Sequence, residues 1–269
     1  SYPLSTTAVN TNLYTTNASD NTVSVIDSTT NTVTDTISVG SYPEFATAVG
    51  TKLYVMNSNS SSVSVIDTTT NTVTGTVSVG SGPRSAILIG TDLYVINTGS
   101  YNVSVIDTTT NTVTDTVSVG SGPRSATVVG THLYVLNVYG NSVSGIDTTT
   151  NTVTDTVSVG AYPYFSAAVG TNLYVLNNNS NSVSVIDTTT NTVTDTVSVE
   201  SNPIYSTLVG TDLYVLNTGS DTVSIIDTTT NTVISSLSVG SNPHSATLIG
   251  TNLYVANLAG NSLSVIDTT

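Results

Sequence analysis

Side chains that could carry out acid–base or metal chemistry are few in this sequence. There are two histidines, His132 and His244, and no cysteine. The histidines fall in different loops of a repeating pattern, so we expect no histidine cluster of the kind that holds zinc or copper. Without cysteine, thiolate nucleophiles and thiolate metal ligands are excluded. Serine and aspartate are abundant, but nothing marks one serine as activated by a base. We expect no cofactor, no metal and no catalytic site.

Aspartates recur at a fixed spacing of 40 residues, each followed by threonine or serine. They are Asp27, Asp67, Asp107, Asp147, Asp187, Asp227 and Asp267. A calcium site is the sharper interpretation, but calcium needs about six to eight converging oxygens. These carboxylates come one per repeat, with no second carboxylate beside them in the sequence. We therefore interpret them as turn residues that accept hydrogen bonds from nearby main-chain amides.

The same spacing runs through the whole chain without insertion or deletion. All the prolines fall in one column, at Pro3, Pro43, Pro83, Pro123, Pro163, Pro203 and Pro243. A tyrosine column follows, at Tyr14, Tyr54, Tyr94, Tyr134, Tyr174, Tyr214 and Tyr254. We expect these tyrosines to pack between repeats and to find a partner for each hydroxyl.

Each complete repeat contains four short runs rich in Val, Ile, Thr and Tyr, separated by Gly, Asn and Asp. In the fourth repeat the runs cover residues 126–129, 133–137, 142–147 and 152–159. This pattern predicts four antiparallel strands, and a period of about 40 residues with four strands is typical of a propeller blade. The sequence predicts an all-β, seven-bladed β-propeller forming a single domain, 1–269. The expected blades start near residues 1, 41, 81, 121, 161, 201 and 241.

The apolar pattern orders the strands within a blade. The second strand is apolar on both faces, as at Leu133 to Leu136, which predicts a place between neighbouring blades. The fourth strand alternates valine with threonine and carries Asp155 in its middle, so it belongs at the outer rim. The first strand is short and has small side chains, which suits the centre.

The last repeat is incomplete. Seven units of 40 residues would need 280, and the chain has 269, so 11 are missing after Thr269. The last blade should therefore lack its outermost strand, which leaves residues 262–267 with an unpaired edge. We expect a segment preceding Ser1, or a strand from a neighbouring molecule, to complete it.

The repeat motifs resemble those of the YVTN family of β-propeller repeats. The matching residues read Tyr-Val-Leu-Asn, then Ser-Val-Ser-Val-Ile-Asp-Thr-Thr-Thr-Asn-Thr-Val, then Ser-Val-Gly-Ser-x-Pro, and they cover the whole chain. The family's third motif residue, threonine, is present here only at Thr16. The family includes surface-layer and secreted microbial proteins, so the resemblance implies an extracellular or cell-surface location.

The composition of the chain narrows the classes of partner that it can bind. Only 7% of the residues are charged, and the formal net charge is −14, with Lys52, Arg84 and Arg124 the only Lys and Arg residues. Such a negative field repels phosphate backbones, so nucleic acid is not an expected partner. No apolar run reaches the roughly 20 residues of a membrane helix, so no membrane span is expected.

Variation among the repeats is concentrated around the proline and in the loop after the second strand. In an up-and-down meander these two segments lie at the same end of each blade. The predicted binding residues there are Glu44, Phe45, Arg84, Arg124, Tyr164, Phe165, Tyr205 and His244, with Tyr101 and Tyr139 in the second loop. Exposed aromatic side chains beside arginine are typical of recognition sites. The alternative interpretation is free drift of loop tips on which nothing packs.

Three classes of function follow. The first is a secreted or cell-surface structural or adhesion module that contacts surface proteins, glycans or copies of itself. The second is a carbohydrate- or peptide-binding propeller that uses the variable residues. The third is a lactonase-like hydrolase, which is disfavoured because we expect no concentrated set of titratable groups near the mouth of the central channel beyond Glu44 and His244. We expect a binding function and no enzymatic activity.

Overall fold

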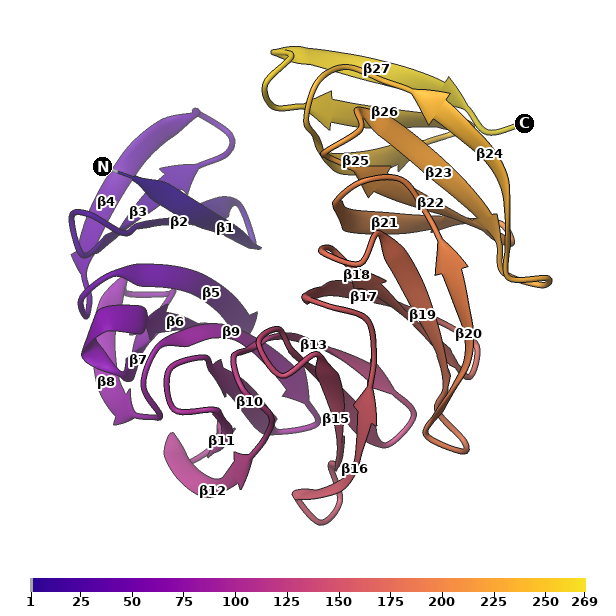
Figure 1. Cartoon of the computed structure of the whole chain (residues 1–269). Helices are drawn as coiled ribbons and strands as arrows, with labels where there is room; N and C mark the ends of the chain where they lie inside the picture. Colours follow the sequence, from indigo (N-terminus) through magenta and orange to yellow (C-terminus); the bar gives the residue numbers. More distant parts are fainter. Residues whose placement is uncertain (1) are drawn as a thin grey trace. The chain divides into compact units, whose positions relative to one another are not determined.

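The computed structural model describes residues 2–269 and contains only β-strands and one short 3-10 turn (Figure 1). Seven separate antiparallel sheets follow one another along the chain, and within each sheet the strands lie in sequence order. Contacts divide the chain into two compact units, Ser1–Ser125 and Ala126–Thr269, called the N-terminal and C-terminal units below. The predicted single domain, 1–269, stays a prediction.

The N-terminal unit holds three complete sheets. The first consists of β1 (Pro3–Val9), β2 (Asn12–Asn17), β3 (Thr22–Asp27) and β4 (Thr32–Ser38). The second consists of β5 (Pro43–Val49), β6 (Lys52–Asn57), β7 (Ser62–Asp67) and β8 (Thr72–Ser78), with the 3-10 turn η1 (Ser58–Ser60) between β6 and β7. The third consists of β9 (Pro83–Ile89), β10 (Asp92–Asn97), β11 (Asn102–Asp107) and β12 (Thr112–Ser118).

The fourth sheet begins at the boundary between the units, and the C-terminal unit holds the rest. The fourth consists of β13 (Pro123–Val129), β14 (His132–Asn137), β15 (Ser142–Asp147) and β16 (Thr152–Ser158). The fifth consists of β17 (Pro163–Val169), β18 (Asn172–Asn177), β19 (Ser182–Asp187) and β20 (Thr192–Ser198). The sixth consists of β21 (Pro203–Val209), β22 (Asp212–Asn217), β23 (Thr222–Asp227) and β24 (Thr232–Ser238). The seventh consists of β25 (Pro243–Ile249), β26 (Asn252–Asn257) and β27 (Ser262–Asp267).

Tight turns join the strands because the sequence places residues that tolerate a left-handed backbone where the chain reverses. Gly50, between β5 and β6, has φ +58°, and Asn71, between β7 and β8, has φ +54°. Glycine has no Cβ to clash in this conformation, and asparagine is the side chain most often found there after glycine. The spacing of these two residue types therefore sets the strand lengths.

The core lies between neighbouring sheets of the same unit. One cluster joins Tyr54 and Met56 of β6 to Leu93 and Val95 of β10, all fully buried. The Tyr54 hydroxyl also donates to Asn111 Oδ1 of the third sheet at 2.7 Å. Tyr14, Tyr134 and Tyr174 donate to the equivalent asparagines of their own next sheets. These contacts confirm the predicted position of the second strand, and they confirm the predicted role of the tyrosine column at these four tyrosines.

The first strand of each sheet is longer than the sequence predicted. In the fourth repeat it covers Pro123–Val129, where only residues 126–129 were expected. The prediction that this strand starts only at residue 126 is therefore wrong. Proline lacks an N–H but is tolerated as the first residue of a strand. In the second sheet Pro43 pairs with Asn57 and Phe45 with Met56, so Glu44 is the extra residue of a β-bulge.

The seventh sheet has three strands, as the sequence predicted. Among residues 2–269 no fourth strand pairs with β27. In each of the other six sheets the outer strand pairs with the third strand and is largely exposed, as in β20 with its pattern of one buried residue in seven. The predicted outer position of the fourth strand is confirmed.

Candidate binding surface

Hydrogen bonds bring the two variable segments of a sheet together. In the second sheet the amide of Ser58, after β6, donates to Tyr42 O at 2.9 Å, and the amide of Asn59 donates to Ser41 O at 3.1 Å. The same pair of bonds recurs in the fifth sheet, from Asn178 to Tyr162 O and from Asn179 to Ala161 O. The residues around each proline therefore lie at the same end of the sheet as the loop after the second strand.

In the N-terminal unit the structure pairs two predicted site residues of opposite charge. Arg84 Nε lies 3.2 Å from Glu44 Oε1, and both residues immediately follow the proline of their strand. The Ser85 hydroxyl donates to Arg124 O at 3.1 Å, so Arg124 lies beside β9 within the N-terminal unit. The negative charge of Glu44 offsets the positive charge of Arg84. The positive field around Arg84 is therefore weaker than that of an arginine without a carboxylate beside it. The binding role predicted for Arg84 and Arg124 stays a prediction.

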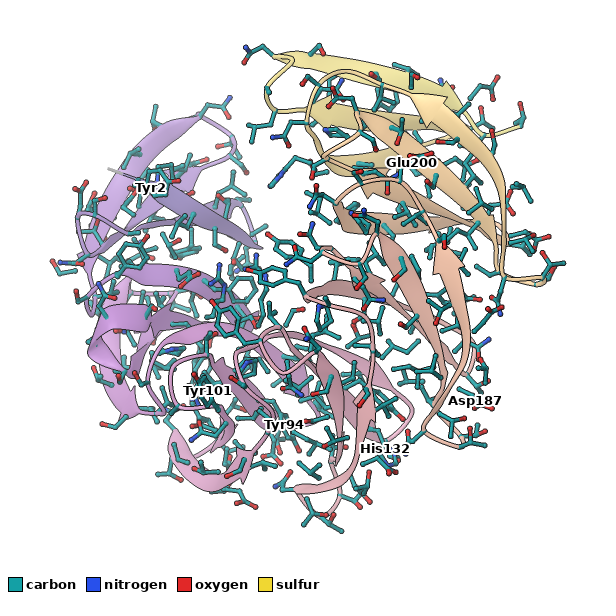
Figure 2. The ribbon with its side chains drawn as sticks, in the orientation of Figure 1. Tyr2, Tyr94, Tyr101, His132, Asp187 and Glu200 are labelled. Atoms are coloured by element: carbon teal, nitrogen blue, oxygen red, sulfur yellow. The ribbon has the colours of Figure 1, made fainter. Side chains whose placement is uncertain are left out.

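Phe45 and Tyr101 have different environments in this unit. Phe45 is half-buried and packs against the apolar cluster between the second and third sheets, so it is a packing residue as well as a site candidate. Tyr101 lies in the loop between β10 and β11, labelled in Figure 2, and is 46% exposed. The backbone of Tyr101 is left-handed, with φ +56°. At the equivalent position of the other sheets the residue is Asn, Ser or Asp.

In the C-terminal unit three tyrosines form a continuous row. The ring centroids of Tyr139 and Tyr162 are 6.3 Å apart with the planes at 61°, and those of Tyr162 and Tyr164 are 6.2 Å apart with the planes at 23°. Tyr139 is 66% exposed, and the other two are half-buried. We call these residues the tyrosine row. The sequence predicted Tyr139 and Tyr164 as site residues and missed Tyr162, which joins them.

The backbone at Tyr162 is held in a conformation unfavourable for tyrosine. Its φ is +60°, and the equivalent residues of the third and fourth repeats are Gly82 and Gly122, at +65° and +66°. The Tyr162 amide donates to Asn141 Oδ1 at 3.0 Å, and Tyr162 O accepts from the Asn178 amide at 2.9 Å. A residue other than glycine pays roughly 1–2 kcal/mol in this region. A tyrosine where other repeats have glycine is the signal that could have identified Tyr162 from the sequence.

The remaining predicted residues lie further along the C-terminal unit. The rings of Phe165 and Tyr205 contact each other, with centroids 5.0 Å apart, and both pack against apolar clusters between sheets. His244 is exposed and lines a pocket of about 300 Å³ on the seventh sheet, together with Leu258 and Asn261. The structure thus brings Phe165 and Tyr205 together, and it places His244 at a separate pocket.

The aspartate column serves the turns. The amide and hydroxyl of Thr109 donate to Asp107 Oδ1 at 2.7 and 2.5 Å, and Asp187, labelled in Figure 2 at the end of β19, makes the same bonds with Thr189. The Thr109 hydroxyl, followed by the Thr109 amide, lowers the pKa of Asp107 below its ordinary value. These bonds confirm the predicted turn role.

Comparisons with solved structures agree on the fold. A chain of Kuenenia stuttgartiensis hydrazine synthase matches with a TM-score of 0.73 and 22% identity, over 99% of this chain and 96% of that one. The computationally designed Ika8 protein matches with a TM-score of 0.80 and 12% identity, over 98% and 82%. BamB from Moraxella catarrhalis matches with a TM-score of 0.75 and 16% identity, over 97% and 83%.

The sequence itself matches no family model and no curated protein. The repeat, the seven sheets and the structural similarities define the chain as an all-β propeller repeat protein. Within residues 2–269 no helix is long and apolar enough to span a membrane.

Proposed function

We propose that this propeller is a non-catalytic binding module of the YVTN type, secreted or displayed at a cell surface, where it serves in adhesion. The repeat motifs and the Thr- and Asn-rich shell support the family and the location. Surface proteins, glycans and copies of the chain are the candidate partners.

The tyrosine row carries the proposal. Tyrosine offers a large, rigid ring and a hydroxyl at a small cost in side-chain entropy, and aromatic residues are enriched at binding sites. A strained tyrosine at position 162 gives no advantage to the fold, because glycine occupies the same place in two other repeats. Tyr42 has the same left-handed backbone, so the feature particular to Tyr162 is its contact with two other tyrosine rings, which offers a ligand a continuous aromatic surface.

The charge of the chain favours a neutral ligand for the row. With a net charge of −14, the protein repels anions at long range. Exposed aromatic faces bind the apolar faces of sugar rings or the side chains of an extended peptide. A neutral glycan or peptide is therefore the class of ligand that fits best.

Catalysis has little support at the described residues. A general acid or base works best with a pKa near the working pH. The aspartates of the turn column have their pKa lowered by hydrogen bonds from the following threonine, as at Asp107 and Asp187, which moves them away from neutral pH. We therefore assign the chain to binding and not to hydrolysis.

The test compares binding by the parent chain and by Tyr162→Gly on arrays of neutral oligosaccharides and of peptides. The free energy of unfolding in urea should stay within about 1 kcal/mol, since relief of the left-handed strain offsets the greater chain entropy of glycine. Affinity for the retained ligand should fall about tenfold or more, because central aromatic residues dominate binding sites.

Tyr42→Gly is the matched control. Tyr42 has the same left-handed backbone, at φ +57°, but no ring neighbour among residues 2–269. The control should bind like the parent. Equal binding by the Tyr162→Gly variant, equal losses in both variants, or no ligand retained from either array would each contradict the proposal.

A further inference from the structure

The tyrosine row joins two neighbouring sheets of the C-terminal unit. Tyr139 lies in the loop between β14 and β15 of the fourth sheet, and Tyr162 comes directly before β17 of the fifth. The Tyr162 amide donates to Asn141 Oδ1 at 3.0 Å, so the backbone that carries Tyr162 is bound to the loop that carries Tyr139. The centroids of the two rings lie 6.3 Å apart, with the planes at 61°. A covalent bond between these rings would connect the fourth sheet to the fifth.

Tyr139 is exposed because of its position in the repeat. It is 66% exposed. The equivalent residues of the second, fifth and sixth sheets are exposed too, although each of these sheets has a neighbouring sheet of its own unit on both sides; they are Asn59, Asn179 and Gly219. An oxidising enzyme can therefore reach the ring of Tyr139 without any change in the sheets.

Tyrosine is the side chain of this protein best suited to a covalent crosslink. The chain contains 14 tyrosines and no cysteine, so the disulfides that crosslink many exported proteins are not available to it. Two phenol rings that each lose one electron and one proton couple through a carbon–carbon bond. Coupling within one molecule is strongly favoured when the two rings are held next to each other.

We propose that Tyr139 and Tyr162 form a site of oxidative crosslinking, at which a haem peroxidase and hydrogen peroxide join the two rings as dityrosine. Each phenol gives up one electron and its hydroxyl proton, and the two radicals bond through ring carbons next to the hydroxyl-bearing carbon. The hydrogens of those two carbons then move to the two oxygens. One hydrogen peroxide takes up the two electrons and two protons and is reduced to two waters. This inference uses the tyrosine row but does not depend on ligand binding.

Tyr139, and not Tyr164, is the expected partner of Tyr162. The rings of Tyr162 and Tyr164 are stacked, with the planes 23° apart, and both residues are half-buried. The new bond joins the edges of two rings, whereas stacked rings present their faces to each other. The exposed ring of Tyr139 has room to turn its edge toward Tyr162.

The experiment treats a dilute solution of the full chain with a haem peroxidase and hydrogen peroxide. The monomer band of a denaturing gel should acquire dityrosine fluorescence, and the mass of the monomer should fall by that of two hydrogens. Proteolytic peptides that contain Tyr139 and Tyr162 should be linked. The melting temperature should rise by about 5 °C, because the crosslink restricts the unfolded chain over a loop of about 24 residues.

Two variants locate the crosslink. Tyr139→Phe keeps the ring but removes the phenol, so the monomer should lose dityrosine. Tyr2→Phe is the matched control, because Tyr2 has the position of Tyr162 in its own repeat, is 59% exposed and has no ring neighbour among residues 2–269. This control should crosslink like the parent chain.

A third variant tests the same geometry in the N-terminal unit. Tyr42 has the position of Tyr162 in the second sheet, and its amide donates to Asn21 Oδ1 at 2.8 Å. Ser19, which is exposed, has the position of Tyr139 in the first sheet. Ser19→Tyr combined with Tyr139→Phe should regain dityrosine in the monomer, with the link between position 19 and Tyr42.

Four outcomes would overturn the proposal. They are unchanged dityrosine in the Tyr139→Phe monomer, dityrosine confined to linked dimers, loss of dityrosine from Tyr2→Phe, and an unchanged melting temperature in the crosslinked parent chain. No regained crosslink in the double variant would contradict the geometry from which the site is inferred.

Discussion

At the scale of single residues, the aspartate column links stability to acid pH. The Thr109 hydroxyl and amide lower the folded-state pKa of Asp107 below its ordinary value of 3.8. A carboxyl group with a lowered pKa contributes stability that is fully present above the unfolded-state pKa, and this stability is lost as the pH falls through the folded-state pKa. The same direction holds for Asp187 and Asp227.

We therefore expect the melting temperature to fall below about pH 4 and to fall less steeply in a variant with Asp107→Asn, Asp187→Asn and Asp227→Asn. Asparagine can still accept the turn hydrogen bonds but does not titrate. Melting curves between neutral pH and pH 2 measure the difference. Thr109→Val, which removes only the hydroxyl donor to Asp107, should give a smaller change of the same kind. Parallel pH profiles for the parent chain and the triple variant would contradict the role of these carboxylates.

At the scale of strands, one position departs from the repeat in a way that lowers stability. Gly145 of β15 stands where β11 has Val105 and β19 has Val185, both fully buried. A Cβ added at Gly145 would meet Tyr134 Cε1 at 3.4 Å, an ordinary contact distance. Glycine within a strand is unfavourable in entropy and leaves nothing to pack.

Gly145→Val should raise the free energy of unfolding by about 1–2 kcal/mol, from strand propensity and apolar burial together. Urea unfolding measures this change. The reciprocal variant, Val185→Gly, should lower it by a similar amount or more, because it also leaves a cavity. If Gly145→Val does not raise the free energy of unfolding, the side chains of Tyr134 and Thr154 do not move far enough to make room for the two methyl groups of the valine.

The strands were largely predictable because the sequence repeats each signal six or seven times. Alternating valine and threonine, the Asn and Gly turns and the tyrosine column gave the number of sheets and the missing strand of the last one. The start of the first strand was not predictable, since proline followed by a variable residue also describes a loop. A β-bulge interrupts the alternation of apolar and polar residues by which a strand is recognised in a sequence. Glu44 and its equivalents therefore had the pattern of loop residues.

Part of the candidate site could be predicted for the same reason. Tyr139 and Tyr164 stood out as aromatic residues in variable columns, and the row they form depends on Tyr162. Tyr162 was missed because Tyr42 has the same type at the same position of the repeat, so the residue did not look unusual. Only its backbone angle, and the glycines at the equivalent positions, show that tyrosine is a costly choice there.

At the scale of the whole molecule, the buried tyrosines make the fold sensitive to alkali. Burial raises the pKa of Tyr54 to about 12 and raises the pKa of Tyr14, Tyr134 and Tyr174 in the same direction. An acid whose pKa is raised on folding stabilises the folded state below its unfolded-state pKa, near 10, and loses this effect as the pH rises through the folded-state value.

The near-ultraviolet absorbance of tyrosinate should therefore rise in two steps during an alkaline titration. The sheets should stay intact by circular dichroism during the first step. Tyr54 should titrate in the second step, near pH 12, and Tyr14, Tyr134 and Tyr174 should titrate above the ordinary tyrosine value, together with loss of the sheets. The same titration in guanidinium should show one step near pH 10. A single step near pH 10 with the sheets intact would contradict this account of the core.

The sameness of the contacts between neighbouring sheets has a consequence for folding kinetics. Four tyrosine hydroxyls each donate a hydrogen bond to an asparagine 57 positions further along the chain, those of Tyr14, Tyr54, Tyr134 and Tyr174. The apolar residues around these tyrosines are nearly identical. Nothing in such a contact distinguishes the correct neighbour from another copy of it. Repeat proteins characteristically misassemble in this way. During refolding, sheets that are not adjacent in sequence can pair by mistake, and escape requires breaking a contact as stable as the native one. The side chains do not distinguish the correct neighbouring sheet from a wrong one. Fast folding therefore depends on sheets that are adjacent in sequence meeting each other first.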